Sequence, residues 1–144
     1  MEDGATGRRG DGERGQIKGY RDLWVWENAM DAGMAVFEVT KRFPVEERYS
    51  MTDQIRRSSR SVAANIAEAW RKRRYKAAFV AKLSDAESEA CETQTWIEFA
   101  LRCGYMESDR AKELDTQYEH ILSQLVTVIN QADRWIVKTK GSKD

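Results

Sequence analysis

A run of basic residues between aromatic side chains is the part of this sequence best suited to binding a ligand. The stretch WRKRRYK, Trp70 to Lys76, places four consecutive cations between a tryptophan and a tyrosine. Arginine guanidinium groups pair well with phosphate oxygens, and aromatic rings can stack on unpaired bases. We therefore predict a nucleic-acid-binding surface that also includes arginines earlier in the same helix. Its predicted residues are Arg56, Arg57, Arg60, Trp70, Arg71, Lys72, Arg73, Arg74 and Tyr75.

The charge of the whole chain gives no such signal, because its 24 basic residues are balanced by 24 acidic residues. The positive charge is concentrated locally instead: the segment from Glu46 to Arg74 has eight basic and four acidic residues. The same arginines could instead form salt bridges, for example Arg57 with Asp53 one helical turn away, or with the acidic helix that follows. Both interpretations remain open at this stage.

Catalytic chemistry has little support in the sequence. The only histidine is His120, and no Glu-x-x-His motif, glycine-rich phosphate loop, CxxC pair or nucleophile elbow is present. We predict a protein that is not an enzyme and has neither a cofactor nor a metal site. The two cysteines, Cys91 and Cys103, would be about 18 Å apart on one helix, too far for a disulfide. They predict reduced thiols and a cytoplasmic protein.

The predicted elements are four helices, over about Tyr20–Arg42, from Met51 into the low seventies, from there to Gly104, and over about Ser108–Lys138. Apolar residues recur in them every three or four positions, and no strand-like alternation is present. The stripes predicted to be buried are Met51, Ile55, Ser58, Val62, Ile66 and Ala69 in the second helix, Phe79, Leu83, Ala86, Ala90, Thr93, Ile97 and Leu101 in the third, and Leu114, Tyr118, Ile121, Leu125, Val128 or Ile129, Ala132 and Ile136 in the fourth. The fold class predicted is all-α, an antiparallel four-helix bundle over residues 20–139. Residues 1–19 and 140–144 are predicted to be flexible tails. No apolar run approaches the length of a membrane span.

The first predicted helix is apolar on two faces. We expect Leu23, Trp26, Met30, Met34 and Phe37 to face the core of the bundle. A second stripe then lies on the far side at coiled-coil-like spacing. With an apolar pair on the third helix, it predicts an interface between copies of the chain. The predicted interface residues are Val25, Ala29, Ala32, Val36, Val39, Trp96 and Phe99.

A polar stripe along the second helix accompanies its apolar one. Gln54, Ser58, Ser61 and Asn65 lie along one edge of the predicted core face. Serine and asparagine are poor residues for the middle of a helix, so something should compensate for them. We predict hydrogen bonds from this stripe to a neighbouring helix that fix the register of the bundle.

Several of these residues together form a pattern that resembles the 23S rRNA intervening-sequence proteins, a family of four-helix bundles. The similarity covers about Tyr20 to Val137. The residues that carry it are Phe43, Pro44, Glu46 or Glu47, Tyr49, Gln54 to Ser59, Ser61, Ala64 to Glu68, Phe79, Leu83, Ala86, Ser88, Glu89, Glu92, Thr93, Gly104 and Tyr105. The sequence departs from the family at Ala69 and Arg71, where members usually have glycines.

The resemblance implies a ring-like homopentamer. A related branch, the accessory variability determinant (Avd) of diversity-generating retroelements, is strongly basic and binds nucleic acid and a reverse transcriptase, whereas this chain is neutral. We therefore predict a homo-oligomeric RNA-binding protein, associated with rRNA or with a retroelement. The alternative is an adaptor ring that docks a partner such as a reverse transcriptase without touching nucleic acid.

Overall fold

The computed structural model describes residues 16–138, and within this range it contains four α-helices and three short 3₁₀ turns. The helices are α1 (Trp24–Thr40), α2 (Met51–Arg71), α3 (Lys76–Arg102) and α4 (Ser108–Asn130). The 3₁₀ turns are Tyr20–Asp22, Val45–Glu47 and Ala132–Arg134. The first and fourth helices are thus shorter than predicted. The first residues of the predicted first helix and the last residues of the predicted fourth helix form separate 3₁₀ turns instead.

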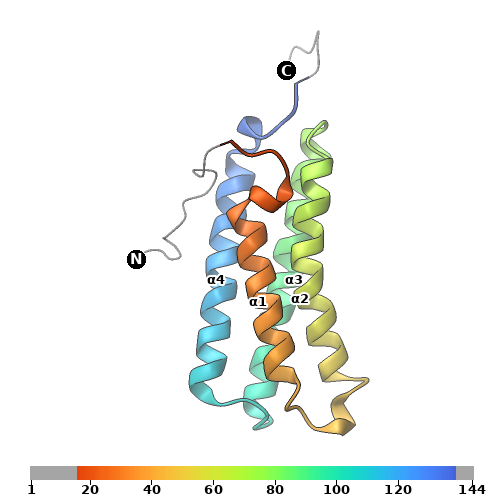
Figure 1. The fold of residues 1–144 in the computed structure, drawn as a ribbon, viewed down its shortest axis with the longest axis vertical. Coiled ribbons are helices and arrows are strands. Elements are labelled where there is room, and N and C mark those ends of the chain that lie inside the picture. The colour runs from red at the N-terminus through yellow and green to blue at the C-terminus, as the bar shows by residue number, and fades with distance from the viewer. Residues whose placement is uncertain (1–15, 139–144) are drawn as a thin grey trace.

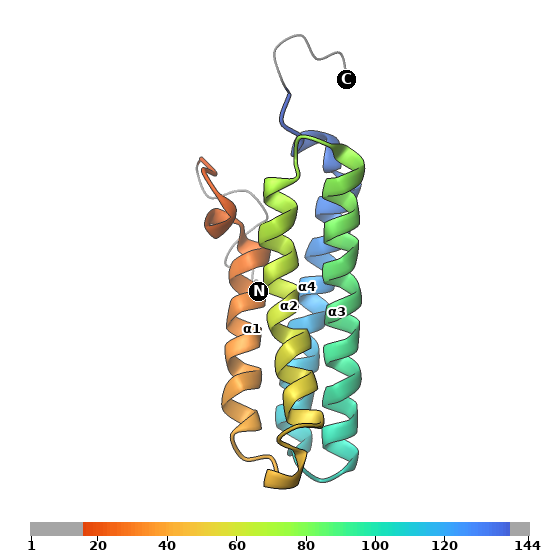
Figure 2. The same ribbon diagram turned by 90° about the vertical axis from the view of Figure 1, so that its right-hand side faces the viewer.

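The four helices run alternately up and down and pack as a bundle (Figure 1). Each is in contact with the next along the chain, and α1 closes the bundle against α4. The view turned by 90° shows the α1–α2 and α2–α3 pairs side by side along their lengths (Figure 2). The predicted antiparallel four-helix bundle is confirmed. None of the described helices is long and apolar enough to cross a membrane.

The core of α2, α3 and α4 consists of the residues that their periodicity predicted. In α2 the whole predicted stripe is buried, including Ile55, Val62 and Ile66. In α3 the one shift is at the end of the helix, where Ala100 is buried and Leu101 only half-buried. In each of these helices one apolar stripe runs along the helix, so burying that stripe against the neighbours satisfies the hydrophobic effect.

The orientation predicted for α1 is wrong. Val25, Ala29, Ala32 and Val36, expected on the outside, are 0–4% exposed and belong to the core. They cannot form the predicted interface between copies. The helix instead turns outward a set of larger apolar residues, which were expected to be the core stripe. The outer face of α1, as we call it, consists of Trp26, Met30, Met34 and Phe37.

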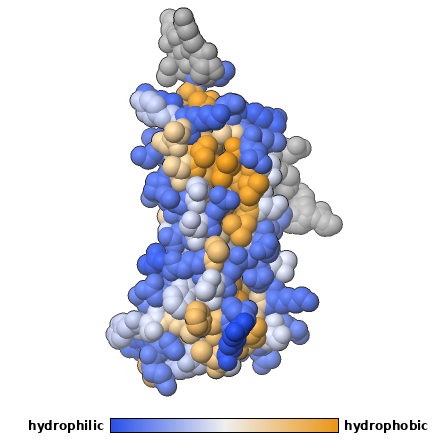
Figure 3. Space-filling view, turned by 180° about the vertical axis from the view of Figure 1, so that it is seen from behind, coloured by the Kyte–Doolittle hydropathy of each residue, from blue (hydrophilic) through white to orange (hydrophobic). Residues whose placement is uncertain are grey.

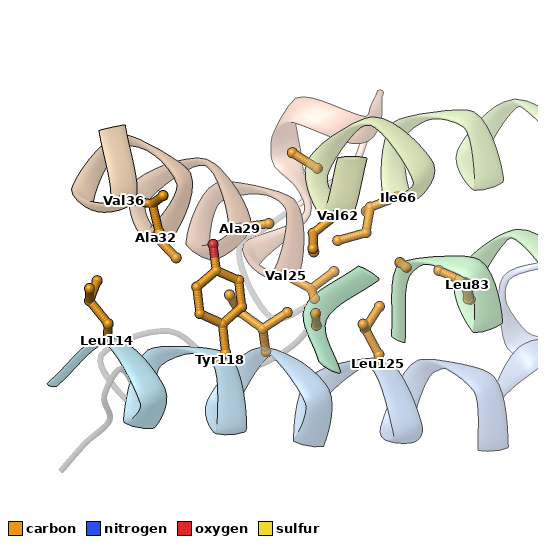
Figure 4. Close-up of a cluster of buried hydrophobic side chains, with 14 of the residues drawn as sticks. Val25, Ala29, Ala32, Val36, Val62, Ile66, Leu83, Leu114, Tyr118 and Leu125 are labelled. Carbon is orange, nitrogen blue, oxygen red and sulfur yellow. The ribbon is translucent and has the colours of Figure 1, made fainter. Parts of the chain in front are cut away.

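Neighbouring side chains explain why the smaller residues are inside. Tyr118 rises from α4 toward α1, and its ring occupies the space facing Ala29 and Ala32 (Figure 4). On the α2 side, a Cβ atom placed on Gly33 would be 3.7 Å from the carbonyl oxygen of Ser59, an ordinary van der Waals distance. A bulky side chain in place of Ala29 or Ala32 would collide with the ring of Tyr118, because protein interiors are close-packed.

The predicted polar stripe of α2 does bond to a neighbouring helix. The buried hydroxyls of Ser58 and Thr93 lie 2.8 Å apart and join α2 to α3. Farther along, the amide oxygen of Asn65 accepts a hydrogen bond from Lys82 of α3 at 3.2 Å. A slip of one helix past the other would leave these polar groups buried without partners, which is costly. The predicted hydrogen bonds to a neighbouring helix are thus present for these two residues.

The turn between α2 and α3, which the sequence left undetermined, occupies residues 72–75. It needs no glycine, because none of its residues has a positive φ angle. The turn after α3 does need one: Gly104 has a φ of 79°, in the left-handed region that glycine adopts without strain. Most of the predicted N-terminal tail and all of the C-terminal one lie outside the described residues. At the end of the former, Ile17 packs against the core.

Candidate nucleic-acid interface

Four arginines surround a groove on the first half of α2 and the loop before it. This arginine groove has a volume of about 430 Å³ and is lined by Arg48, Thr52, Asp53, Arg56, Arg57 and Arg60. Three of the arginines come from one helix, where positions 56, 57 and 60 are neighbours on the outer surface. The arrangement offers several guanidinium groups to one anionic ligand, with Asp53 as the one acidic residue among them.

Arg56 and Arg60 share an aromatic support. The guanidinium carbons of Arg56 and Arg60 lie 4.8 Å and 6.0 Å from the ring centroid of Phe37 in α1. The Nε of Arg56 also donates a 2.8 Å hydrogen bond to the hydroxyl of Thr40. Among residues 16–138, the structure shows no hydrogen bond or ion pair to the terminal nitrogens of these two guanidiniums, so those nitrogens are available. These two residues are therefore held in place while they can still bind phosphate oxygens.

Arg57 is occupied by the helix opposite. It donates a 2.8 Å hydrogen bond to Glu92 of α3 and lies 3.6 Å from Glu89. The bond to Glu92 raises the pKa of Arg57. The pKa of Glu92 is lowered, first by the hydrogen bond it accepts from Trp96 and then by Arg57. The sequence left open whether the arginines bind nucleic acid or form salt bridges. Arg57 forms salt bridges with α3, so it contributes little free positive charge.

A tyrosine that the sequence analysis did not assign to the site stands at one end of the arginine groove. Tyr49 is 86% exposed, and the guanidinium of Arg48 lies 5.9 Å from its ring centroid. Tyr49 and Arg48 lie in the loop before α2, outside the helical cluster that guided the prediction. The sequence did contain a signal for an exposed aromatic ring: Tyr49 follows an arginine in a predicted loop and belongs to no apolar stripe.

The loop that presents Tyr49 is tied to the bundle by a carboxylate. One oxygen of Glu47 accepts a 3.2 Å hydrogen bond from the backbone N–H of Met51, at the start of α2. The other accepts a 2.9 Å hydrogen bond from the hydroxyl of Tyr105, in the turn after α3. This hydrogen bond is the main reason that the pKa of Tyr105 is raised to about 12. Glu47 thus joins the loop to the start of α2 and to the turn after α3.

The cluster around the α2–α3 turn divides into an inner and an outer part. Trp70 is buried and packs edge-on against Trp135, with the ring centroids 6.3 Å apart. Arg73 lies 3.5 Å above the centre of the Trp70 ring and donates a 2.9 Å hydrogen bond to the carbonyl oxygen of Trp70. Burial lowers the pKa of Arg73, with a smaller contribution from Arg71. The prediction that Trp70 is a stacking platform is wrong, because no base can reach its ring.

The outer part of this cluster is accessible. Arg71, Lys72 and Arg74 are exposed, and the structure shows no acidic partner for them among the residues it describes. Tyr75, the residue just before α3, is 67% exposed and keeps its predicted availability for stacking. The turn therefore presents three cations and one aromatic ring, a smaller set than the sequence predicted.

The outer face of α1 adds an apolar groove beside the arginines. Met30 and Met34 are 40% and 53% exposed. A groove of about 290 Å³ runs between this face and α2, with Arg60 at its edge. The residues that line it are Ala29, Met30, Gly33, Met34, Phe37, Ser59, Arg60 and Ala63.

The other predicted interface residues have mixed positions. Val39 is half-buried and packs against the core. Trp96 is half-buried with its Nε1 bonded to Glu92 at 3.0 Å, and Phe99 is 51% exposed beside it. The ring centroids of Trp96 and Phe99 are 5.6 Å apart. Phe99 lies outside the core as predicted, whereas Trp96, like Val39, packs against the core.

Apolar surface also lies on the opposite side of the bundle. Figure 3 shows this side, with orange surface gathered in the half where α4 ends and α3 begins. On α4, Val126 is 45% exposed and Leu122 and Ile129 are half-buried.

Both Cys91 and Cys103 are free and exposed. Within residues 16–138, no group of histidine, cysteine and carboxylate side chains is placed to hold a metal ion.

Comparisons with known proteins agree with the pattern noted in the sequence. The model of the 23S rRNA-intervening sequence protein family matches residues 21–127. A similar solved structure is a protein of unknown function of the S23 ribosomal protein family from Bacteroides thetaiotaomicron. It is 29% identical, with a TM-score of 0.66 over 73% of this chain and 97% of that chain. No match was found among curated proteins. Since the family model covers most of the bundle, this chain belongs to the 23S rRNA-intervening sequence protein family.

Proposed function

We propose that this protein binds RNA through the cationic surface of α2, without catalysing a reaction. The observation that carries the proposal is the arginine groove, in which Arg56 and Arg60 are held on the Phe37 ring with their terminal nitrogens available. The exposed cations of the α2–α3 turn extend this surface at the other end of the helix. A neutral chain can bind a polyanion in this way, because the charge that matters is the charge near the phosphates.

Assembly of several copies would strengthen such binding, and we propose a homo-oligomer. Support comes from the outer face of α1, which exposes methionines that no part of the described chain covers. Contiguous exposed apolar patches usually mark interaction sites. The number of subunits we propose is five, the stoichiometry that the family resemblance implies. Each copy would bring its own arginine groove, so that many weak phosphate contacts act together.

The RNA proposal can be tested by measuring affinity for a single-stranded RNA at several salt concentrations. We expect the logarithm of the association constant to fall steeply with the logarithm of salt, by about 0.7 for each phosphate contact. Arg60→Glu with Arg71→Glu should weaken binding and flatten this slope, since both residues are exposed. The matched control, Arg102→Glu with Lys112→Glu on α3 and α4, should leave the slope unchanged. Absent or salt-independent binding would contradict the proposal and favour the protein-binding adaptor.

Self-association can be tested separately by sedimentation equilibrium at micromolar concentration. Met34→Glu places a charge on the outer face of α1, where the side chain is exposed, so the fold should tolerate it. We expect the wild-type chain to sediment as an oligomer and this variant as a monomer. The control Ser88→Glu changes an exposed residue of α3 and should leave the oligomer intact. A wild-type monomer would remove the proposal.

A further inference from the structure

We infer that the RNA ligand is a single strand that runs along α2 and stacks one base on Tyr49 and another on Tyr75. The inference rests on the proposed function and names its ligand class. It starts from two rings, one just before α2 and the other at the end of the α2–α3 turn. They are 86% and 67% exposed, and both stand among cations.

The surroundings of the two tyrosines are alike. Tyr49 is next to Arg48, whose guanidinium lies 5.9 Å from its ring centroid, and the arginine groove begins here. Tyr75 directly follows the exposed Arg74, with Lys72 and Arg71 before it. Burying a large aromatic side chain is favourable, so a ring left in water beside arginines has a free face to offer. Stacked bases bind such faces with little regard to sequence.

Positive charge lies at both ends of α2, and small side chains lie between the two groups on one side of the helix. Arg60 and Arg71 lie on the same side of the helix, since their spacing of eleven residues is close to three turns. Between them Ala64 is exposed and Ala67 half-buried, and these small side chains let a sugar–phosphate backbone approach. Glu68 is the acidic residue on this stretch, and Lys82 of α3 neutralises it at 2.7 Å.

The length of the path suits a short strand. The 21 residues of α2 correspond to about 31 Å, which is about nine nucleotides at 3.4 Å for each stacked nucleotide. A duplex cannot use both rings, because its bases are paired and stacked on one another. Proteins that bind duplex RNA contact its phosphates and 2′-hydroxyls instead. The exposed tyrosines therefore favour a single strand of at least this length.

The test compares three RNA probes: a 20-nucleotide oligouridine, a 4-nucleotide oligouridine and a 20-base-pair duplex, all at one salt concentration. Fluorescence anisotropy is measured for the full chain and for Tyr49→Ala, Tyr75→Ala and the double variant. Tyr49→Phe and Tyr75→Phe are the matched controls, because they keep the ring. Both tyrosines are exposed, so we expect all these variants to fold, which circular dichroism would verify.

We expect the 20-nucleotide strand to bind most tightly. Each Tyr→Ala change should weaken its binding by about 5- to 100-fold, with near-normal binding for the Tyr→Phe controls. The 4-nucleotide strand cannot reach both ends of the helix, so it should bind far more weakly. Equal affinity for the duplex, or Ala variants within twofold of the wild type, would overturn the inference. If the Arg60→Glu and Arg71→Glu changes still weakened binding in that case, the proposed function would stand. No binding of any probe would overturn both.

Discussion

Helices α1 and α2 lie side by side, yet their sequences specify their orientations very differently. In α2, the residues that face away from the core are arginines and other polar groups, so only one orientation keeps the apolar side chains out of water. In α1, one apolar stripe faces the core and another faces outward. The pattern of α1 alone is compatible with two orientations that differ by about half a turn.

What decides between them is the shape of the neighbours. The larger residues of α1 would bury more apolar area, which favours placing Met30 and Met34 inside. Close packing opposes this, since the Tyr118 ring fills the space that faces Ala29 and Ala32. Complementary volume therefore outweighs hydrophobic area. A helix with two apolar faces places its small residues where large neighbours face it.

The largest expected effect comes from removing the side chain that sets this fit. Tyr118→Ala should lower the free energy of unfolding by about 3–5 kcal/mol, the usual cost of truncating a buried aromatic residue. Denaturant unfolding followed by circular dichroism would measure it. Tyr118→Phe keeps the ring and should cost much less. A small loss for Tyr118→Ala would show that the inner face of α1 does not depend on this contact.

The next prediction compares the two faces of α1 directly. Ala32→Leu adds bulk to a fully buried position and should destabilise the fold by about 1–3 kcal/mol. Met34→Leu, of similar size on the outer face, should change the stability by less than about 0.5 kcal/mol, because this side chain is half in water. Denaturant unfolding of both variants is the measurement. The reverse order of effects would restore the orientation that the sequence predicted.

A third prediction separates the buried from the exposed arginines of α2 and its turn. Arg73→Ala should destabilise the bundle by about 1–2 kcal/mol, because it loses the contact with Trp70 and the bond to its carbonyl oxygen. Arg60→Ala should leave the stability nearly unchanged and weaken RNA binding. Thermal unfolding and RNA titration of both variants test this. RNA binding that depends on Arg73 more than on Arg60 would contradict the assignment.

The smallest expected effect is a dependence of stability on pH at the Tyr49 loop. The folded pKa of Tyr105 is raised to about 12, above its ordinary value of about 10. The hydrogen bond to Glu47 therefore contributes its full stability below pH 10 and loses it as the pH rises toward 12. The difference in unfolding free energy between wild type and Tyr105→Phe should shrink over this range. A difference that stays constant would show that the bond does not set the pKa.

The sequence was sufficient for the bundle and for three of its four buried stripes, because periodicity reports burial wherever one face is polar. It was insufficient for α1, whose orientation depends on the packing of Tyr118, far away in the chain. In the candidate site, the basic composition identified the right helix. It could not show that Arg57 pairs with Glu92, that Arg73 covers Trp70, or that Tyr49 stands free. Those facts depend on what packs opposite each residue.

The central claim, that RNA lies along α2, is tested most directly by photocrosslinking. A 20-nucleotide strand containing 4-thiouridine would be irradiated with the full chain, and the crosslinked peptides mapped by mass spectrometry. We predict crosslinks at Tyr49 and within the segment from Arg71 to Tyr75, at the two ends of α2. They should be lost when unlabelled strand competes. Crosslinks confined to α4, or none above background, would contradict the account.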